Sequence, residues 1–129
     1  MGAWGSGPFE NDDAMDFVGA LAGAPASETL PRLARALSLP EGYVESPDGS
    51  TAVAASALVA ARRGYEITDP TASALLADRP FEPDAALRAS AVTALGRVAA
   101  EDSELMELWD EAGGRDAVEA VYRDIRSFL

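Results

Sequence analysis

The chain contains no cysteine, histidine or lysine, and each absence removes a class of chemistry. Without cysteine there is no disulfide, zinc–thiolate site or cysteine nucleophile. Without histidine the chain lacks the commonest general base and the commonest metal ligand. Without lysine it cannot form a Schiff base with a carbonyl substrate. The sequence therefore predicts no cofactor and leaves only carboxylate, amide, hydroxyl and arginine groups for any chemistry.

Positive charge is also scarce. The 10 basic residues are all arginines and face 22 acidic residues, so the formal net charge is −12 and the isoelectric point is near 4.2. Nucleic acids and anionic membranes carry the same sign of charge and would be repelled. We therefore expect neither as a partner, and a basic protein is the partner that this charge favours.

Apolar runs long enough to cross a bilayer are absent from the sequence, and the N-terminus lacks the basic and apolar regions of a secretory leader. We expect a cytoplasmic protein. A length of 129 residues with 48% hydrophobic content predicts one domain over residues 1–129. The sequence leaves the oligomeric state open.

No stretch alternates like a β-strand over more than three or four residues, so we expect an all-α fold, a compact single-domain bundle of about seven short helices. Asp84 and Ser103 are expected to cap the helices that follow them, and either Ser27 or Thr29 is expected to cap the second helix. Prolines and glycines predict the helix ends. The alanine-rich run from Ser50 to Arg63 is expected to be the central buried helix, because small side chains let neighbouring helices approach closely. The first helix is expected over residues 12–23, and the second follows its cap and ends before Leu39-Pro40. The other helices are expected over residues 70–77, 85–100, 104–112 and 115–128.

Apolar residues at helical spacing predict which faces are buried. The last helix has the clearest pattern, and its Glu119 is expected to pair with Arg123. The residues expected to face the core in the first, second, sixth and last helices are Met15, Val18, Leu21 and Ala22, then Leu30, Leu33 and Leu37, then Leu105, Leu108 and Trp109, and finally Val118, Val121, Tyr122, Ile125 and Phe128.

The N-terminal segment combines glycines, a proline and two aromatic residues directly before an acidic helix start. This composition predicts an ordered glycine-rich loop, held against the core by Trp4 and Phe9. The same two rings are also candidates for stacking on a ligand. Asn11 is predicted to cap the first helix, and its replacement by Ala should cost about 1 kcal/mol.

Acidic residues follow the loop, and two ligands are candidates at this position, a divalent cation and a phosphate. Asp12, Asp13 and Asp16, beside Asn11, offer oxygen ligands for a divalent cation, but their spacing differs from a calcium loop, and a well-capped helix start is the interpretation that the sequence favours. A phosphate held by Gly5-Ser6-Gly7 is the weaker alternative, because acidic residues crowd the same position.

A second acidic run, residues 101–111, contains six carboxylates and no basic residue. One interpretation is a docking surface for a basic partner, with Glu104 and Glu107 in contact and Trp109 or Met106 as the anchor. The other is a solvated helix face above buried apolar residues. Arg62 and Arg63, near Tyr65, are candidates for clamping a carboxylate, but they also fit a role at the helix end, where they would pair with local acids.

Three stretches of the sequence resemble a bacterial family of small proteins known as domain of unknown function 4259. They are residues 1–14 (MGAWGSGPFENDDA), residues 43–49 (YVESPDG) and residues 102–109 (DSELMELW). Together they imply that the resemblance covers essentially the whole chain. The family brings no agreed activity. The positions that match its pattern are Trp4, Gly5, Gly7, Phe9, Asn11, Asp12, Ser103, Glu104, Leu108 and Trp109.

Two classes of function remain. The first is a non-enzymatic interaction protein, immunity-like or regulatory, whose acidic surface binds a basic protein. The second is a small enzyme or ligand-binding protein that uses carboxylates at the N-terminal loop, with or without a divalent cation. A deep pocket in which Asp12 or Asp16 converges on Trp4 would favour the second class, and an open acidic face would favour the first.

Overall fold

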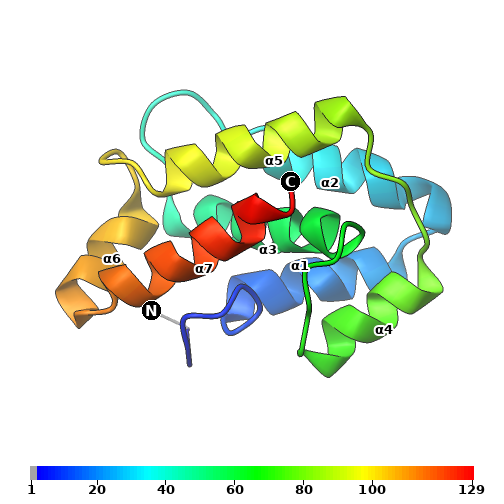
Figure 1. Ribbon diagram of the computed structural model, residues 1–129, viewed down its shortest axis with the longest axis horizontal. Coiled ribbons are helices and arrows are strands. Elements are labelled where there is room, and N and C mark those ends of the chain that lie inside the picture. The colour runs from blue at the N-terminus through cyan, green and yellow to red at the C-terminus, as the bar shows by residue number, and fades with distance from the viewer. Residues whose placement is uncertain (1–2) are drawn as a thin grey trace.

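The computed structural model describes residues 3–129, and over that range the fold is all-α. It has seven α-helices and one short 3₁₀ helix, drawn in Figure 1. Two isolated β-bridges join Ala3 to Asn11 and Val44 to Ser103. The elements are α1 (Asp12–Gly23), η1 (Ala26–Glu28), α2 (Thr29–Leu37), α3 (Ser46–Ala61), α4 (Pro70–Asp78), α5 (Ala85–Val98), α6 (Glu104–Ala112) and α7 (Arg115–Ser127).

Helix α3 runs through the middle of the molecule and packs against α1, α2, α5, α6 and α7 (Figure 1). The prediction of a central buried helix is confirmed, because every residue from Ala52 to Ala60 is buried. Its predicted start was wrong by four residues. The helix begins at Ser46, with Pro47 in its first turn, where the missing proline N–H costs no hydrogen bond.

Three predicted N-caps are confirmed. The side chains of Asn11, Asp84 and Ser103 each accept a hydrogen bond from a backbone N–H in the first turn of the helix that follows, and Asp69 does the same at the start of α4. Neither Ser27 nor Thr29 caps α2, since Thr29 is the first residue of that helix and is itself buried. Each cap satisfies an amide that the helix start leaves free.

Several predicted burial positions are corrected. Ala22 and Leu30 are exposed, and Ala14 and Thr29 take their places in the core. On α6 the buried pair is Leu105 and Met106, whereas Leu108 and Trp109 are only partly buried. On α7 the buried residues are Val118, Tyr122 and Ile125, with Val121 and Phe128 partly buried.

Arginines hold the helix ends together by donating to backbone carbonyls. Arg62 donates to the carbonyls of Leu76 and Arg79 at the end of α4, and lies over the Phe81 ring at 4.8 Å. Arg63 donates to the Phe128 carbonyl at 3.0 Å. The expectation that Arg62 and Arg63 pair with local acids is therefore wrong, because their donors bind carbonyl oxygens at the ends of other helices.

Two further arginines act in the same way. Arg79 donates to the carbonyls of Ala22 and Ala24 at the end of α1, at 3.0 and 3.2 Å. Arg97 of α5 donates to those of Leu39 and Gly42 in the α2–α3 loop, at 3.2 and 2.9 Å. Carbonyls at helix ends lack partners within their own helix, and a guanidinium satisfies them while matching the negative end of the helix dipole. No helix within residues 3–129 has the length and apolar character that a membrane crossing requires.

Candidate functional site

The N-terminal loop closes on the side chain of Glu10. The backbone N–H of Gly7 donates to Glu10 Oε1 at 3.0 Å, and the Trp4 N–H donates to the Glu10 carbonyl at 2.9 Å. A Cβ atom at Gly5 or Gly7 would collide with the Glu10 carboxylate. The two glycines thus leave space for the Glu10 carboxylate. Because a negatively charged group already occupies this position, the geometry argues against a phosphate bound there.

The two aromatic residues of the loop behave differently. Phe9 is buried in the hydrophobic core with 4% of its surface exposed, as predicted. The prediction that Trp4 also anchors the loop was wrong, because its side chain is 61% exposed. The hydrogen bonds to Glu10, and not burial of the Trp4 ring, hold this part of the loop in place.

A small pocket of about 70 Å³ lies beneath this loop, between the starts of α1 and α3 and the inner sides of α6 and α7. Its polar lining includes Asn11, Asp13, Ser46 and Ser50. Its apolar lining residues are Ala3, Pro8, Val53, Leu105, Trp109, Val118 and Tyr122. Among residues 3–129, Asp13 is the one acidic residue in the lining, and no arginine contributes to it.

The cation alternative gains no support from the geometry. Within residues 3–129 no group of three or more carboxylate residues comes close enough to hold a metal ion. Asp12 and Asp16 are exposed, and neither lines the pocket. Trp4 is absent from the lining as well, so the convergence of Asp12 or Asp16 on Trp4 does not occur.

The chain around residue 44 is joined to the start of α6. Val44 N–H donates to the Asp102 carbonyl at 2.8 Å, and Glu104 N–H donates to the Val44 carbonyl at 2.9 Å. Glu104 Oε1 accepts from the Ser46 N–H at 2.7 Å, which satisfies an amide at the start of α3. Two segments almost sixty residues apart therefore form one structural unit.

Tyr43, which the sequence did not single out, stands within this unit on the surface. Its ring is 47% exposed, and its hydroxyl donates to Glu107 Oε2 at 2.9 Å. Partial desolvation, the hydrogen bond to Glu107 and the charges of Glu104 and Glu45 raise the pKa of Tyr43 to about 12. An exposed aromatic ring is thus surrounded by carboxylates.

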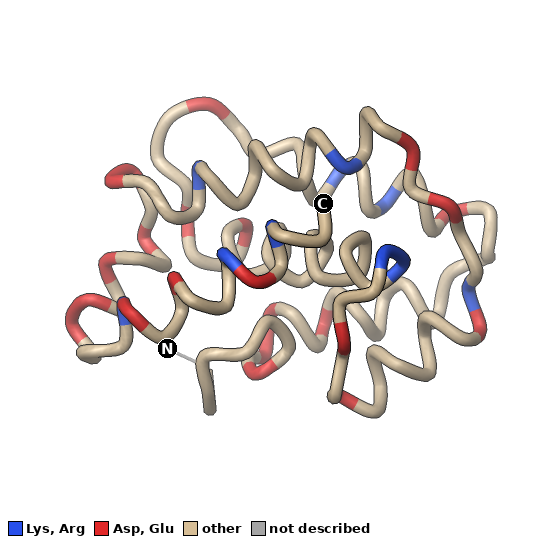
Figure 2. The backbone as a smooth tube through the Cα atoms, in the orientation of Figure 1, with Lys and Arg blue, Asp and Glu red and all other residues tan. Residues whose placement is uncertain are grey.

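Acidic residues gather at the end of the molecule formed by α6 and the α2–α3 loop, which Figure 2 shows as a concentration of red. We call this set the acidic end. Most of its members are exposed and Glu104 is partly buried. The acidic end consists of Glu41, Glu45, Glu101, Asp102, Glu104, Glu107, Asp110 and Glu111.

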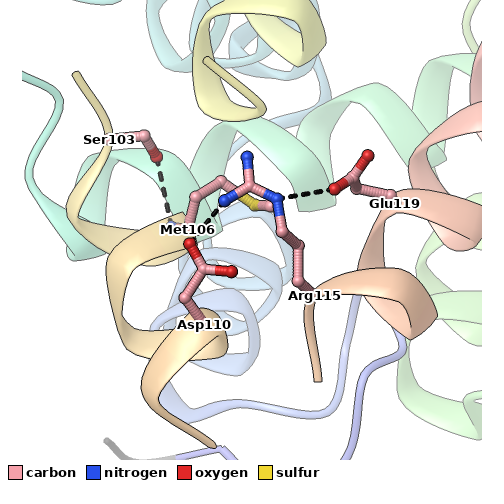
Figure 3. A network of polar contacts seen from close by, with 5 residues as sticks. All are labelled: Ser103, Met106, Asp110, Arg115 and Glu119. Carbon is pink, nitrogen blue, oxygen red and sulfur yellow. Dashed lines mark hydrogen bonds and ion pairs between the residues drawn. The ribbon is translucent and has the colours of Figure 1, made fainter. Parts of the chain in front are cut away.

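Helix α6 carries the candidate contact residues Glu104 and Glu107, and its two candidate anchors differ in burial. Met106 is 2% exposed, so its thioether cannot serve a partner at the surface. Trp109 is partly buried and lines the pocket instead. Arg115 binds Asp110 and also donates to Glu119 at 2.7 Å, as Figure 3 shows, so Arg115 takes the place predicted for Arg123.

Similarity to known proteins identifies the family of this chain. The family model described as Domain of unknown function (DUF4259) matches residues 2–120. The chain belongs to the DUF4259 family. No curated protein and no solved structure matches the chain.

In this DUF4259 protein the three stretches that carry the family resemblance meet at the pocket. The first contributes Gly5, Gly7 and Asn11, the second contributes Ser46, and the third contributes Trp109. Parts of the chain that are far apart in sequence thus converge on one small cavity. Ser50 and Tyr122 also line it but lie outside all three stretches, and no sequence pattern marks them as pocket residues.

Proposed function

We propose that this protein is a non-enzymatic interaction protein that binds a basic protein partner through the acidic end, in an immunity-like or regulatory role in the bacterial cytoplasm. The observation that carries the proposal is the concentration of eight carboxylates at one end of the molecule. Complementary charge at an interface accelerates association and selects partners.

The use of the arginines supports the proposal. Arg62, Arg63, Arg79 and Arg97 donate to backbone carbonyls and form no ion pair with an acidic residue within residues 3–129. Within residues 3–129, Asp110 is the one member of the acidic end that forms an ion pair, with Arg115. A basic partner would therefore meet seven carboxylates that form no ion pair within the described part of the chain.

Tyr43 is the best candidate for an anchor in place of Met106. Aromatic residues contribute strongly at protein interfaces, and a tyrosine ring also attracts cations to its face. Tyr43 is exposed, and its hydroxyl is held by Glu107. The partner surface expected here carries arginine or lysine side chains around an apolar spot.

The second class, an enzyme or ligand-binding protein built on carboxylates of the N-terminal loop, gains little from the geometry. Acid–base catalysis with carboxylates usually requires two groups with separated pKa values. The pocket lining offers Asp13 alone. We therefore place the interaction function first.

The test compares two variants with the same change in net charge. One carries Glu101→Gln, Asp102→Asn, Glu107→Gln and Glu111→Gln at the acidic end. The control carries Glu66→Gln, Asp78→Asn, Glu82→Gln and Asp124→Asn, all exposed and outside the acidic end. Each immobilised protein captures partners from a native lysate, and the captured protein is identified and titrated.

We expect the wild type and the control to capture the same basic protein and the acidic-end variant to lose it. Binding should also weaken steeply as salt shortens the screening length from about 10 Å to about 3 Å. Equal capture by all three proteins, or a captured partner that is not basic, would refute the proposal.

A further inference from the structure

We infer that the pocket beneath the N-terminal loop receives the guanidinium group of one arginine side chain from the basic partner. The inference rests on the proposed function, but it assigns a specific subsite. The pocket borders the acidic end through α6, because Trp109 lines the pocket while the next residue, Asp110, belongs to the acidic end. A partner bound at the acidic end can therefore extend a side chain into it.

The size of the pocket limits what can enter. One water molecule needs roughly 10–15 Å³ of such space. A volume of about 70 Å³ thus accommodates roughly five non-hydrogen atoms. A guanidinium group with its adjoining methylene has this size.

The charge of the lining selects a cation. Asp13 is the only charged side chain in the lining, and it is partly buried. A carboxylate in partial burial binds a guanidinium through charge-assisted hydrogen bonds, which are stronger than neutral ones. Ser46, Ser50 and Asn11 add oxygen acceptors around the same space.

An anion is the wrong occupant, although helix N-termini usually attract one. Three amides at or near the pocket are already occupied by oxygens of the chain. Glu10 Oε1 accepts from Gly7 N–H, Asn11 Oδ1 from Ala14 N–H, and Glu104 Oε1 from Ser46 N–H. An anion in the pocket would also lie beside the Asp13 carboxylate, which repels it.

The remaining lining suits the rest of an arginine side chain. Trp109 and Tyr122 bring aromatic rings, which attract a guanidinium by cation–π interaction. Val53, Leu105 and Val118 offer apolar surface for the methylene groups. The flat guanidinium stacks on rings better than the compact lysine ammonium, and this favours arginine.

The test uses N-acetyl-L-arginine amide as the probe and N-acetyl-L-citrulline amide as its uncharged analogue of the same shape. Each is titrated into the ¹⁵N-labelled full chain, and the amide and indole N–H resonances are followed by NMR. We expect the arginine probe to shift the Trp109 indole and Gly7 amide signals with a millimolar dissociation constant. The citrulline probe should not.

Two variants and one matched control locate the site. Asp13→Asn should weaken binding of the arginine probe at least about ten-fold, because it removes the charged partner. Val53→Leu fills the pocket without changing its charge and should also weaken binding. Asp12→Asn, on the same helical turn but outside the lining, should leave the dissociation constant unchanged. The amide spectrum of each variant reports whether it is folded.

The outcomes separate this inference from the proposed function. Loss of partner capture in the acidic-end variant, together with unchanged binding of the arginine probe, supports both. Partner capture by a wild type that does not bind the probe overturns the pocket and leaves the function. Equal binding of arginine and citrulline, or equal binding by wild type and Asp13→Asn, also overturns the inference. If the probe binds but no basic partner exists, the pocket still binds a guanidinium, but the assignment of that group to a partner fails.

Discussion

At the scale of single residues, the contribution of the hydrogen bond between Gly7 and Glu10 to the free energy of unfolding can be measured by itself. An alanine at Gly7 would place its Cβ on the Glu10 carboxylate and displace it. We expect Gly7→Ala to cost about 1 kcal/mol of unfolding free energy, the value of the lost hydrogen bond. Gly7 is not among the glycines with positive φ, so alanine strains no backbone angle.

A double-mutant cycle checks this prediction by urea denaturation. In a Glu10→Ala background there is no carboxylate to displace, so Gly7→Ala should be nearly neutral there. If Gly7→Ala costs the same free energy in both backgrounds, the cost comes from the backbone at residue 7 and not from the contact with Glu10.

The three tyrosines give a second prediction at this scale. The pKa of Tyr43 is raised to about 12, burial and the charge of Asp124 raise the pKa of Tyr65, and burial raises the pKa of Tyr122 strongly. In the unfolded chain these hydroxyl groups lose their protons near the ordinary tyrosine pKa of about 10. The native state holds them to higher pH, so stability should fall as the pH rises above about 10.

Ultraviolet absorbance of tyrosinate measures this difference. At a pH of about 10 the native protein should show little tyrosinate, and the protein in urea should be about half ionised. Tyr43→Phe should remove one step of the native titration, and Glu107→Gln should move the Tyr43 step to lower pH, because it removes the carboxylate that holds the Tyr43 hydroxyl. A native protein that titrates like the unfolded one would contradict the assignment.

At the scale of elements, α3 is the helix on which the packing depends. Ala57 is completely buried and Ala120, on α7, is exposed. Ala57→Leu should destabilise the protein by about 1–3 kcal/mol, because the surrounding helices leave no room for three more carbon atoms. Ala120→Leu should change stability by less than about 0.5 kcal/mol. Thermal unfolding of both variants tests this prediction. Equal melting temperatures would contradict the tight packing of the other helices around α3.

The same scale marks the limit of inference from sequence. Helical periodicity and capping residues are local signals, and they predicted the all-α class, seven helices and the caps at Asn11 and Ser103. The start of α3 was misplaced because Pro47 and Gly49 usually mark a loop, whereas here the first turn packs Gly49 beside Leu105. That contact lies far away in sequence.

The candidate site shows the same division. Phe9 was correctly placed in the core, but Trp4 has an equally anchoring composition and stays on the surface. Burial of Met106 instead of Trp109 depends on how α6 rotates against α3, which periodicity fixes only to within a residue. The pocket and the exposed Tyr43 arise where Val44 pairs with Ser103, and no local pattern announces that pairing.

At the scale of the whole molecule, the charge balance governs stability as well as recognition. Only three ion pairs are found within residues 3–129, made by Arg32 and Arg115. Five other arginines, Arg62, Arg63, Arg79, Arg88 and Arg97, donate to backbone carbonyls and form no ion pair with an acidic side chain within the described residues. A net charge of −12 then repels itself, and repulsion of this kind destabilises a compact state.

Sodium chloride should therefore stabilise the protein. Between 0.01 M and 1 M salt the screening length falls from about 30 Å to about 3 Å, which removes repulsion across the acidic end. We expect the melting temperature to rise by several degrees, since about 1 kcal/mol corresponds to about 3 °C for a domain of this size. Calorimetry measures the shift. The variant with four neutralised residues at the acidic end should start from a higher melting temperature and gain less from salt, because less repulsion remains to be screened. A melting temperature that falls with salt would mean that the few ion pairs outweigh the repulsion between the carboxylates.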